Sequence, residues 1–331
     1  MRDGGLLGWC TTPLVKLDDT ASGVLARVLT AAPARRQAIF AALAAQEEQV
    51  GFYDAGDDLL PMLFAEVIRH GRPGDILRRA FGEVPEGFAS MLTQIGERPL
   101  PRAKDYIALR ALLADSDARA ADALRGSGRI TSRKLDVLNA LDPRWRHANT
   151  LERIDSGGEA LMFNQAIGFI QSLNSKATDE VVAGAIAAMR ATSTLARLLD
   201  RLLQRADQLP PHPIASGDNE LRPLLSMRDV LDAGRRYRNC LRHRLADVAV
   251  GRMALAEFRG ECLVEFRPLT AGAGWLLRDV HIERNRPVPL SLFADVEAKC
   301  DEIGIPRINE AEGGDGRSSY RHFTKELEWA A

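Results

Sequence analysis

Residues 253–283 read MALAEFRGECLVEFRPLTAGAGWLLRDVHIE, and this stretch decides the fold class of the C-terminal part of the chain. Three runs of strand-like composition follow one another within it, at 253–258, 261–267 and 275–283. Arg259-Gly260 between the first two runs is typical of a tight hairpin turn, and a glycine-containing loop joins the second run to the third. The stretch therefore predicts an antiparallel β-meander.

Alternation along these runs predicts which side chains share a face of the sheet. The second run places Cys262 and Phe266 together. The third run, read as a regular strand, places Leu277, Asp279 and His281 together.

Helical patterns lie on both sides of the meander. Ser226 with Asp229 matches a capping box at the start of one helix, and residues 290–303 form an amphipathic pattern after the third run. We therefore expect residues 225–331 to form an α+β module, a small antiparallel meander packed with helices.

The preceding part of the chain reads as helical nearly everywhere, interrupted by proline and glycine. Pro33 suits the first turn of an alanine-rich helix at 34–49, and Thr178 is placed to cap a helical run that extends to Gln208. No fixed repeat period is evident. We expect an all-helical domain over residues 1–208.

Between the two parts, residues 209–224 read LPPHPIASGDNELRPL. Four prolines and no periodicity are typical of a linker, so the domain boundary is predicted there. His212 stands between prolines and is expected to be exposed to solvent.

Composition restricts the functional classes. The 44 basic and 45 acidic residues nearly cancel, giving a formal net charge of -1, so any binding to nucleic acid must come from a local patch. The first residues lack a secretory signal, and the most apolar helical stretch is interrupted by charges, so we expect no membrane contact. Four cysteines lie far apart and form no CxxC pair, which indicates reduced thiols and a cytoplasmic protein. They are Cys10, Cys240, Cys262 and Cys300.

The basic run 235–244, RRYRNCLRHR, is the first candidate site. If the run is helical throughout, Arg235, Arg238 and Arg242 share one face, and arginines on one face suit phosphate contact. An aromatic residue within the run can stack on a base. The candidate nucleic-acid-binding residues are Arg235, Arg236, Tyr237, Arg238, Arg242 and Arg244. The alternative is a solvated helical face on which the arginines pair with the acids Asp229, Asp232 and Asp247.

The C-terminal part resembles the PcfJ-like proteins, which are found on bacterial mobile elements. The resemblance rests on a helix into Gly234, then Asn239-Cys240-Leu241, a meander that begins after Gly251, and Asn285 with Pro287 after the third strand. It covers roughly residues 224–305. The chain departs from the family pattern at residues 243–245, where His-Arg-Leu stands in place of an expected tyrosine. The resemblance implies a mobile-element or phage context and singles out Asn239, Cys240 and Asn285, but it carries no known activity.

Thiol catalysis is a second interpretation of the same module. Arginines close to Cys240 favour its thiolate. His281 and Asn285 follow later in the chain, and cysteine, histidine, amide is the chain order of papain-like hydrolases. The alternative for Cys240, which is followed by Leu241, is a small buried residue of the core.

A metal site is the third interpretation. Cys240 and His243 could supply two ligands, with Cys262 and His281 completing a zinc site. The second pair is split across two strands, unlike recognised zinc modules, and Cys262 fits a core position, so we predict no metal. No phosphate loop, dinucleotide fingerprint or hydrolase motif is present, so no cofactor is expected.

We therefore expect a non-enzymatic accessory protein of a bacterial mobile element or phage. It would contact DNA, RNA or a partner protein through the basic C-terminal module. The alternative is a cysteine-dependent hydrolase or transferase that uses Cys240 with His281.

Overall fold

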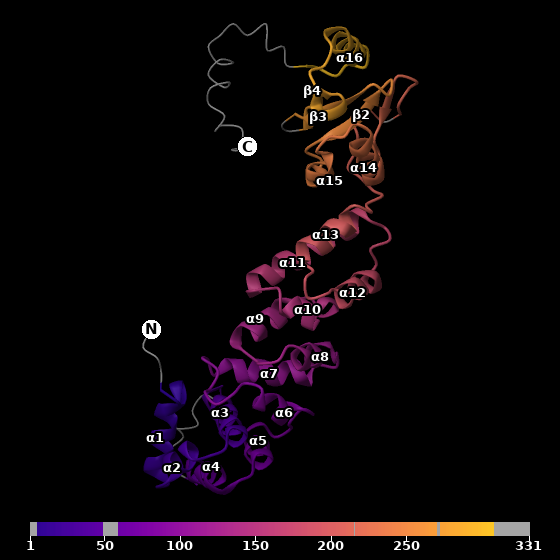
Figure 1. The fold of residues 1–331 in the computed structure, drawn as a ribbon. Coiled ribbons are helices and arrows are strands. Elements are labelled where there is room, and N and C mark those ends of the chain that lie inside the picture. The colour runs from indigo at the N-terminus through magenta and orange to yellow at the C-terminus, as the bar shows by residue number, and fades with distance from the viewer. Residues whose placement is uncertain (1–4, 49–58, 215, 270–271, 308–331) are drawn as a thin grey trace, which may run out of the picture. The chain divides into compact units, whose positions relative to one another are not determined.

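The computed structural model describes residues 5–48, 59–214, 216–269 and 272–307 (Figure 1). Helices dominate, and a small antiparallel sheet follows the helical region, which confirms the predicted α+β class. None of the described helices is both long and apolar enough to cross a lipid bilayer. The chain divides into two compact units. Unit 1 comprises Met1–Gly168 and Thr178–Leu198, and unit 2 comprises Phe169–Ala177 and Leu199–Ala331.

The described residues of unit 1 form helices and turns, with α3 at the centre of the packing. The side chains of residues 36–46 of this helix are all buried, and α3 packs against α5, α6 and α7. A helix buried on every side needs small residues for close approach, and the alanines of this segment supply them. The helices are α1 (Thr11–Thr20), α2 (Val24–Leu29), α3 (Pro33–Glu48), α4 (Leu59–His70), α5 (Pro73–Phe81), α6 (Phe88–Thr93), α7 (Lys104–Ala114), α8 (Arg119–Gly126), α9 (Ser132–Ala140), α10 (Ala148–Leu151), α11 (Gly157–Leu173), α12 (Asp179–Ala187) and α13 (Leu195–Leu203), with 3-10 turns at Gly8–Cys10 and Pro143–Trp145; α11 and α13 continue into unit 2.

The helical run predicted from Thr178 to Gln208 is interrupted. Thr178 caps α12 as expected, because its side chain accepts a hydrogen bond from the Val181 amide. The helix then ends at Ala187, and α13 begins only at Leu195. A single uninterrupted helix was therefore the wrong prediction for this segment.

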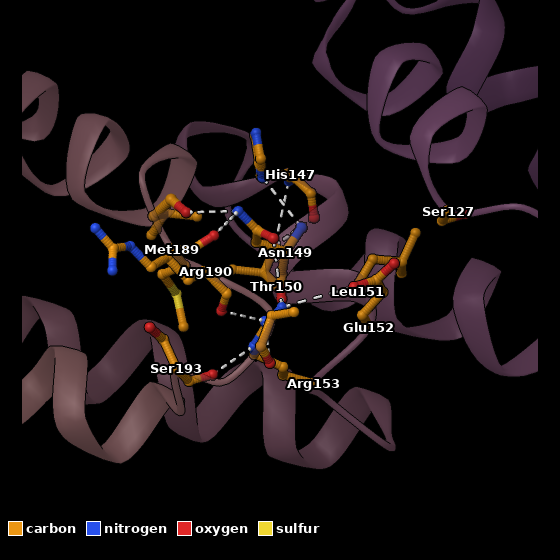
Figure 2. A network of polar contacts seen from close by, with 12 residues as sticks. Ser127, His147, Asn149, Thr150, Leu151, Glu152, Arg153, Met189, Arg190 and Ser193 are labelled. Carbon is orange, nitrogen blue, oxygen red and sulfur yellow. Dashed lines mark hydrogen bonds and ion pairs between the residues drawn. The ribbon is translucent and has the colours of Figure 1, made fainter.

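Side chains from α10 and the residues after it hold the turn between α12 and α13 (Figure 2). Asn149 Nδ2 donates to the carbonyl of Ile186 at 2.9 Å. Arg153 Nε donates to the carbonyl of Ser193 at 2.8 Å, and its Nη2 donates to that of Arg190 at 2.9 Å. The Ile186 carbonyl belongs to the last turn of α12, and those of Arg190 and Ser193 belong to the connection, so these bonds tie the connection to α10 and the residues after it.

We expect Arg153→Ala to lower the free energy of unfolding by about 2 kcal/mol, since hydrogen bonds from a charged donor contribute about 1.5–3 kcal/mol and water replaces part of them here. Urea unfolding followed by far-UV circular dichroism measures the change. Arg190→Ala is the control, because the Arg190 side chain is exposed and only its backbone carbonyl takes part. Equal losses in the two variants would show that the guanidinium of Arg153 does not hold the turn.

Unit 2 is built around a four-stranded antiparallel sheet with the strand order β1-β2-β3-β4. The predicted hairpin turn is present, with Arg259 at φ 48° and Gly260 at φ 72°, the left-handed conformation that such a turn requires. The capping box is also confirmed, since Ser226 and Asp229 exchange bonds at the start of α14. The elements are β1 (Leu221–Pro223), α14 (Met227–Arg236), η3 (Leu241–His243), α15 (Leu245–Ala249), β2 (Ala254–Phe258), β3 (Cys262–Pro268), β4 (Trp275–His281), η5 (Glu283–Asn285) and α16 (Leu290–Glu302).

The two faces of the sheet carry different layers (Figure 1). Leu255 and Leu263 pack with α14 and α15 in one core. Ala256, Val264 and Phe266 pack with α16 in the other. Both faces of the sheet are therefore covered by helices. The face under α16 is apolar, whereas the face under α14 and α15 also carries polar side chains.

The segment predicted as a linker, residues 209–224, belongs to unit 2. Leu221 pairs with Phe258 at the edge of the sheet. His212, expected to be exposed, is partly buried: its ring nitrogen Nε2 lies 2.8 Å from the Leu255 carbonyl and its ring meets Phe266 edge-on. The prediction of solvent exposure was wrong because these contacts hold His212 against the sheet.

Candidate functional site

The basic run 235–244 does not form one helix. Helix α14 ends at Arg236, Arg238 has a left-handed φ of 47°, and a separate 3-10 turn begins at Leu241. Arg235, Arg238 and Arg242 therefore do not share a helical face, and the geometry predicted for a phosphate-binding face is wrong.

Most arginines of the run have acidic partners. Arg235 pairs with Asp232 at 2.8 Å, Arg238 with Glu283 at 3.5 Å, and Arg244 with Asp247 at 3.2 Å, while Arg236 pairs with Glu257. The alternative of charge-paired arginines thus holds for Asp232 and Asp247. Asp229, the third acid named for that role, instead completes the capping box.

Tyr237 cannot act as a stacking platform. It is only 6% exposed, and its hydroxyl points towards the carbonyl of Cys262 at 3.5 Å. Arg242 is exposed and forms no ion pair with the side chains that the structure describes. The run therefore lacks both the stacking residue and the shared arginine face that the sequence predicted.

A cavity of about 1100 Å³ lies beside this run in unit 2. It brings together side chains that the sequence analysis had connected by chain order alone. Its lining residues are Asn239, Cys240, Leu241, Arg244, Asp247, Arg252, Met253, Glu265, Arg267, Arg278, Asp279, Val280, His281, Asn285, Arg286, Pro287 and Val288. Cys240, His281 and Asn285 thus share one cavity with Arg244.

A β-bulge in β4 turns polar side chains towards the cavity. Glu265 pairs with Asp279, but the next residue, Phe266, pairs with Leu277, so Arg278 is the extra residue of the bulge. Leu277 consequently packs under α16 with Phe266, and Asp279 lines the cavity. The predicted common face for Leu277, Asp279 and His281 was wrong, because a bulge shifts the alternation by one residue.

Glu265 is the organising group of the cavity. The residue is 7% exposed. Its carboxylate accepts a hydrogen bond from Arg267 Nε at 2.7 Å and lies 3.2 Å from His281 Nε2. Arg244 Nη2 lies 4.0 Å from the same carboxylate. One buried acid therefore positions two arginines and the histidine.

The two titratable partners shift each other's pKa. Burial alone would raise the pKa of Glu265, but its hydrogen bond with His281 and the charge of Arg267 outweigh burial and lower it. The hydrogen bond to Glu265 raises the pKa of His281 above 6.5, against burial and the nearby charge of Arg244. The pair is thus stabilised in its charged form.

Cys240 differs from the other three cysteines. It is exposed, whereas Cys10, Cys262 and Cys300 are buried. Burial raises the pKa of the Cys262 thiol to about 12 and that of Cys300 to about 11. The expectation that a cysteine beside Leu241 turns into the core is wrong, since only Leu241 is buried there.

The residues named for a zinc site do not converge. Cys262 packs under α16, on the face opposite to His281, and His243 is exposed and lies outside the cavity lining. Within the described part of the chain, no group of three or more histidine, cysteine or acidic side chains has the geometry to hold a metal ion.

Strained backbone surrounds Cys240. Arg238, Arg284 and Asn285 have φ of 47°, 59° and 51°, values that side chains other than glycine adopt rarely. The Arg284 amide donates to the Tyr237 carbonyl at 2.8 Å, which joins the two strained segments directly. Strain of this kind costs about 1–3 kcal/mol per residue and concentrates at functional sites.

Sequence reasoning did not identify Glu265 or four of the five cavity arginines. The sequence of β3 carried a signal, because Glu265 is the one charged residue among the buried residues 262–266. The unidentified arginines come from two strands and two connecting segments and carry no motif. They are Arg252, Arg267, Arg278 and Arg286.

The charge of the lining is positive. Five arginines face the three carboxylates of Asp247, Glu265 and Asp279, which leaves an excess of two positive charges with His281 neutral and of three with His281 protonated. The cavity is therefore suited to an anionic ligand.

Comparison with known proteins does not identify a family for this chain. No protein-family model matches the chain, and neither the curated proteins nor the solved structures contain a significant match.

Proposed function

We propose that unit 2 contacts nucleic acid by binding phosphate groups in the arginine-lined cavity. The observation that carries this proposal is the gathering of five arginines around one cavity of about 1100 Å³. Guanidinium groups bind phosphate oxygens in a bidentate manner. The whole chain has a net charge of -1, so the attraction is local to this cavity.

The lining also indicates what kind of contact is made. None of its residues is a tryptophan, tyrosine or phenylalanine, and base stacking on aromatic rings is the usual platform for unpaired bases. Contact through the phosphate backbone carries no sequence information by itself. The proposed binding is therefore tolerant of sequence and sensitive to salt.

The biological setting is part of the proposal. The resemblance to PcfJ-like proteins singles out Asn239, Cys240 and Asn285, and these three positions line the cavity. Their common location supports an accessory role in a bacterial mobile element or phage. A partner protein with an acidic segment is the other occupant that the charge of the cavity allows.

We expect charge reversal at Arg252 or at Arg286, each as a single variant, to weaken binding to a fluorescently labelled single-stranded 20-mer of DNA or RNA. Each lost phosphate contact should reduce the slope of log affinity against log salt by roughly one unit. Fluorescence anisotropy across a salt series measures both the affinity and the slope. Both arginines are exposed at the cavity, so the fold should be retained.

Arg242→Glu is the matched control, since it makes the same charge change at an exposed arginine outside the lining. An equal loss in the control would overturn the assignment to the cavity. Absence of salt-dependent binding by the unaltered protein would overturn nucleic-acid binding itself. Stronger binding of a poly-glutamate peptide than of either oligonucleotide would replace nucleic acid by an acidic protein partner.

A further inference from the structure

The cavity contains a nucleophile, a base and a carboxylate, which phosphate binding does not require. Cys240 is exposed and lines the cavity together with His281. His281 Nε2 lies 3.2 Å from the buried carboxylate of Glu265. Because that nitrogen is engaged, Nδ1 is the imidazole nitrogen left for a partner in the cavity.

We propose that Cys240, His281 and Glu265 form a thiol-based acyl-transfer centre in this cavity. Cys240 is the nucleophile, His281 exchanges the proton, and Glu265 is a positioning residue that orients the imidazole. The backbone strain beside Cys240 and at Asn285 is the cost of holding these segments at the cavity.

The charged groups around His281 on balance favour its protonated form, the imidazolium. Glu265 on β3 and Asp279 on β4, the strand of His281 itself, lie 3.2 and 3.9 Å from His281 Nε2 and support the imidazolium. Arg244 opposes it, and the same arginine lines the cavity with Cys240. Arg267 is bound to Glu265 and holds that carboxylate in its charged form.

Amide groups are available for the oxygen that becomes negative during the reaction. Asn239 Oδ1 accepts a hydrogen bond from the Leu241 amide at 3.2 Å, which leaves the two Nδ2 hydrogens as donors. Asn285 lies in the same lining. Amide donors aimed at such an oxygen are a common source of transition-state stabilisation.

The reaction balances with water as the second substrate. The Cys240 thiolate forms a bond to the acyl carbon, and the bond from that carbon to the leaving atom breaks with its electron pair on the leaving atom. His281 gives that atom a proton. Water, after losing a proton to His281, then attacks the thioester, which releases the carboxylic acid and restores the Cys240 thiolate with His281 protonated.

The substrate class follows from the lining. Five arginines favour an ester or thioester that also carries a phosphate or carboxylate group. This preference rests on the proposed function of the cavity as an anion site, whereas the pairing of Cys240 with His281 does not.

Alkylation of Cys240 in the full chain by iodoacetamide, mapped by mass spectrometry from pH 5 to 9, tests the pairing. An ordinary thiol with a pKa near 8.5 is about 0.3% thiolate at pH 6, so a thiolate stabilised by His281 should react at least about 10-fold faster there. His281→Gln should remove this advantage, and His243→Gln, at the exposed neighbouring histidine, should retain it. An identical pH profile in His281→Gln and the unaltered protein would overturn the centre.

A second measurement does not depend on altering the histidine. Replacement of the exposed Cys240 by alanine is compatible with folding, and loss of a neighbouring thiolate should lower the pKa of His281, followed by its ring proton in an NMR titration. An unchanged His281 titration would also overturn the centre.

Two activated esters test the reaction and the substrate class separately. The unaltered protein should form an acyl adduct on Cys240 with p-nitrophenyl acetate and, at least several-fold faster, with the anionic mono-p-nitrophenyl succinate. Failure of both to acylate Cys240 would overturn acyl transfer. Equal rates with the two esters would overturn only the anionic preference and the anion site on which it rests.

Discussion

Replacing Gln37 by alanine is expected to lower the free energy of unfolding of unit 1 by about 4 kcal/mol. The Gln37 side chain is fully buried in α3. Its Nε2 donates to the carbonyls of Gly96 and Arg98, each at 2.8 Å. Its Oε1 accepts a bond from the Tyr106 hydroxyl at 2.7 Å, and that hydroxyl accepts one from the Leu100 amide at 3.0 Å.

The magnitude follows from the groups that the variant leaves behind. A buried polar group without a partner costs about 1–3 kcal/mol, which applies to the Tyr106 hydroxyl, and each of the two part-buried carbonyls loses a hydrogen bond worth about 1 kcal/mol. The space left by the side chain adds a cavity term. Far-UV circular dichroism during urea unfolding measures the loss, because the regular secondary structure described in unit 1 is helical.

The same helix offers a matched control. Gln46 is also buried, but its Oε1 has no hydrogen-bond partner among the described residues. Gln46→Ala should therefore cost only about 1 kcal/mol, mainly through lost packing. Equal losses at the two positions would mean that packing, and not the polar network, makes Gln37 important.

Local signals in the sequence predicted much of the fold because they act over a few residues. The caps at Thr178 and Ser226 start helices where they were expected. The Arg259-Gly260 turn sets the register of the hairpin, in which Phe258 pairs with Cys262. Such features depend on hydrogen bonds between near neighbours, so the residue types alone indicate them.

Features set by distant contacts could not be predicted in the same way. The break between α12 and α13 is held by Asn149 and Arg153, which are nearly 40 residues away in sequence. The bulge at Arg278 changes the face of Asp279 without any glycine or proline to mark it. The acids that pair with Arg236 and Arg238 lie on other elements, so the run 235–244 alone overstated the exposed positive charge.

The candidate site, too, was predicted only in part from the sequence. Chain order suggested Cys240, His281 and Asn285 as one group, and all three line the cavity. Glu265 was not predicted, because its role depends on which side chains β4 places beside it across the sheet. A buried carboxylate on a strand is a stronger indication of a site than the basic run, since burial of an acid requires partners.

Glu265→Gln is expected to destabilise unit 2 by about 3 kcal/mol at pH 5.5. The carboxylate is 7% exposed and bonds to Arg267 and His281. Removing one member of a buried charge group leaves the others without compensation and typically costs about 3–5 kcal/mol; the lower value applies here because the partners are partly exposed. Urea-dependent hydrogen exchange of peptides from β2–β4, read by mass spectrometry in the full chain, reports on this unit by itself.

The pair also makes stability depend on pH in a defined window. The pKa of His281 is raised by folding, so its contribution is complete below about pH 6.5 and is lost as the pH rises through the folded-state pKa. The pKa of Glu265 is lowered by folding, so its contribution is present above about pH 4.5 and is lost as the pH falls through the folded-state pKa. The unaltered protein should therefore be most stabilised by this pair between about pH 4.5 and 6.5.

Glu257 on the adjacent strand provides the matched control. It is 6% exposed and bonds to Arg222 and Arg236, but it has no histidine partner. Glu257→Gln should therefore also destabilise unit 2, by about 2–3 kcal/mol, and should keep the decrease in stability above pH 6.5. Glu265→Gln should lose most of that decrease, because the hydrogen bond to Glu265 is the main cause of the raised pKa of His281. If both variants retain the same pH profile, the histidine is not coupled to Glu265, and the carboxylate stabilises the unit through its arginine partners alone.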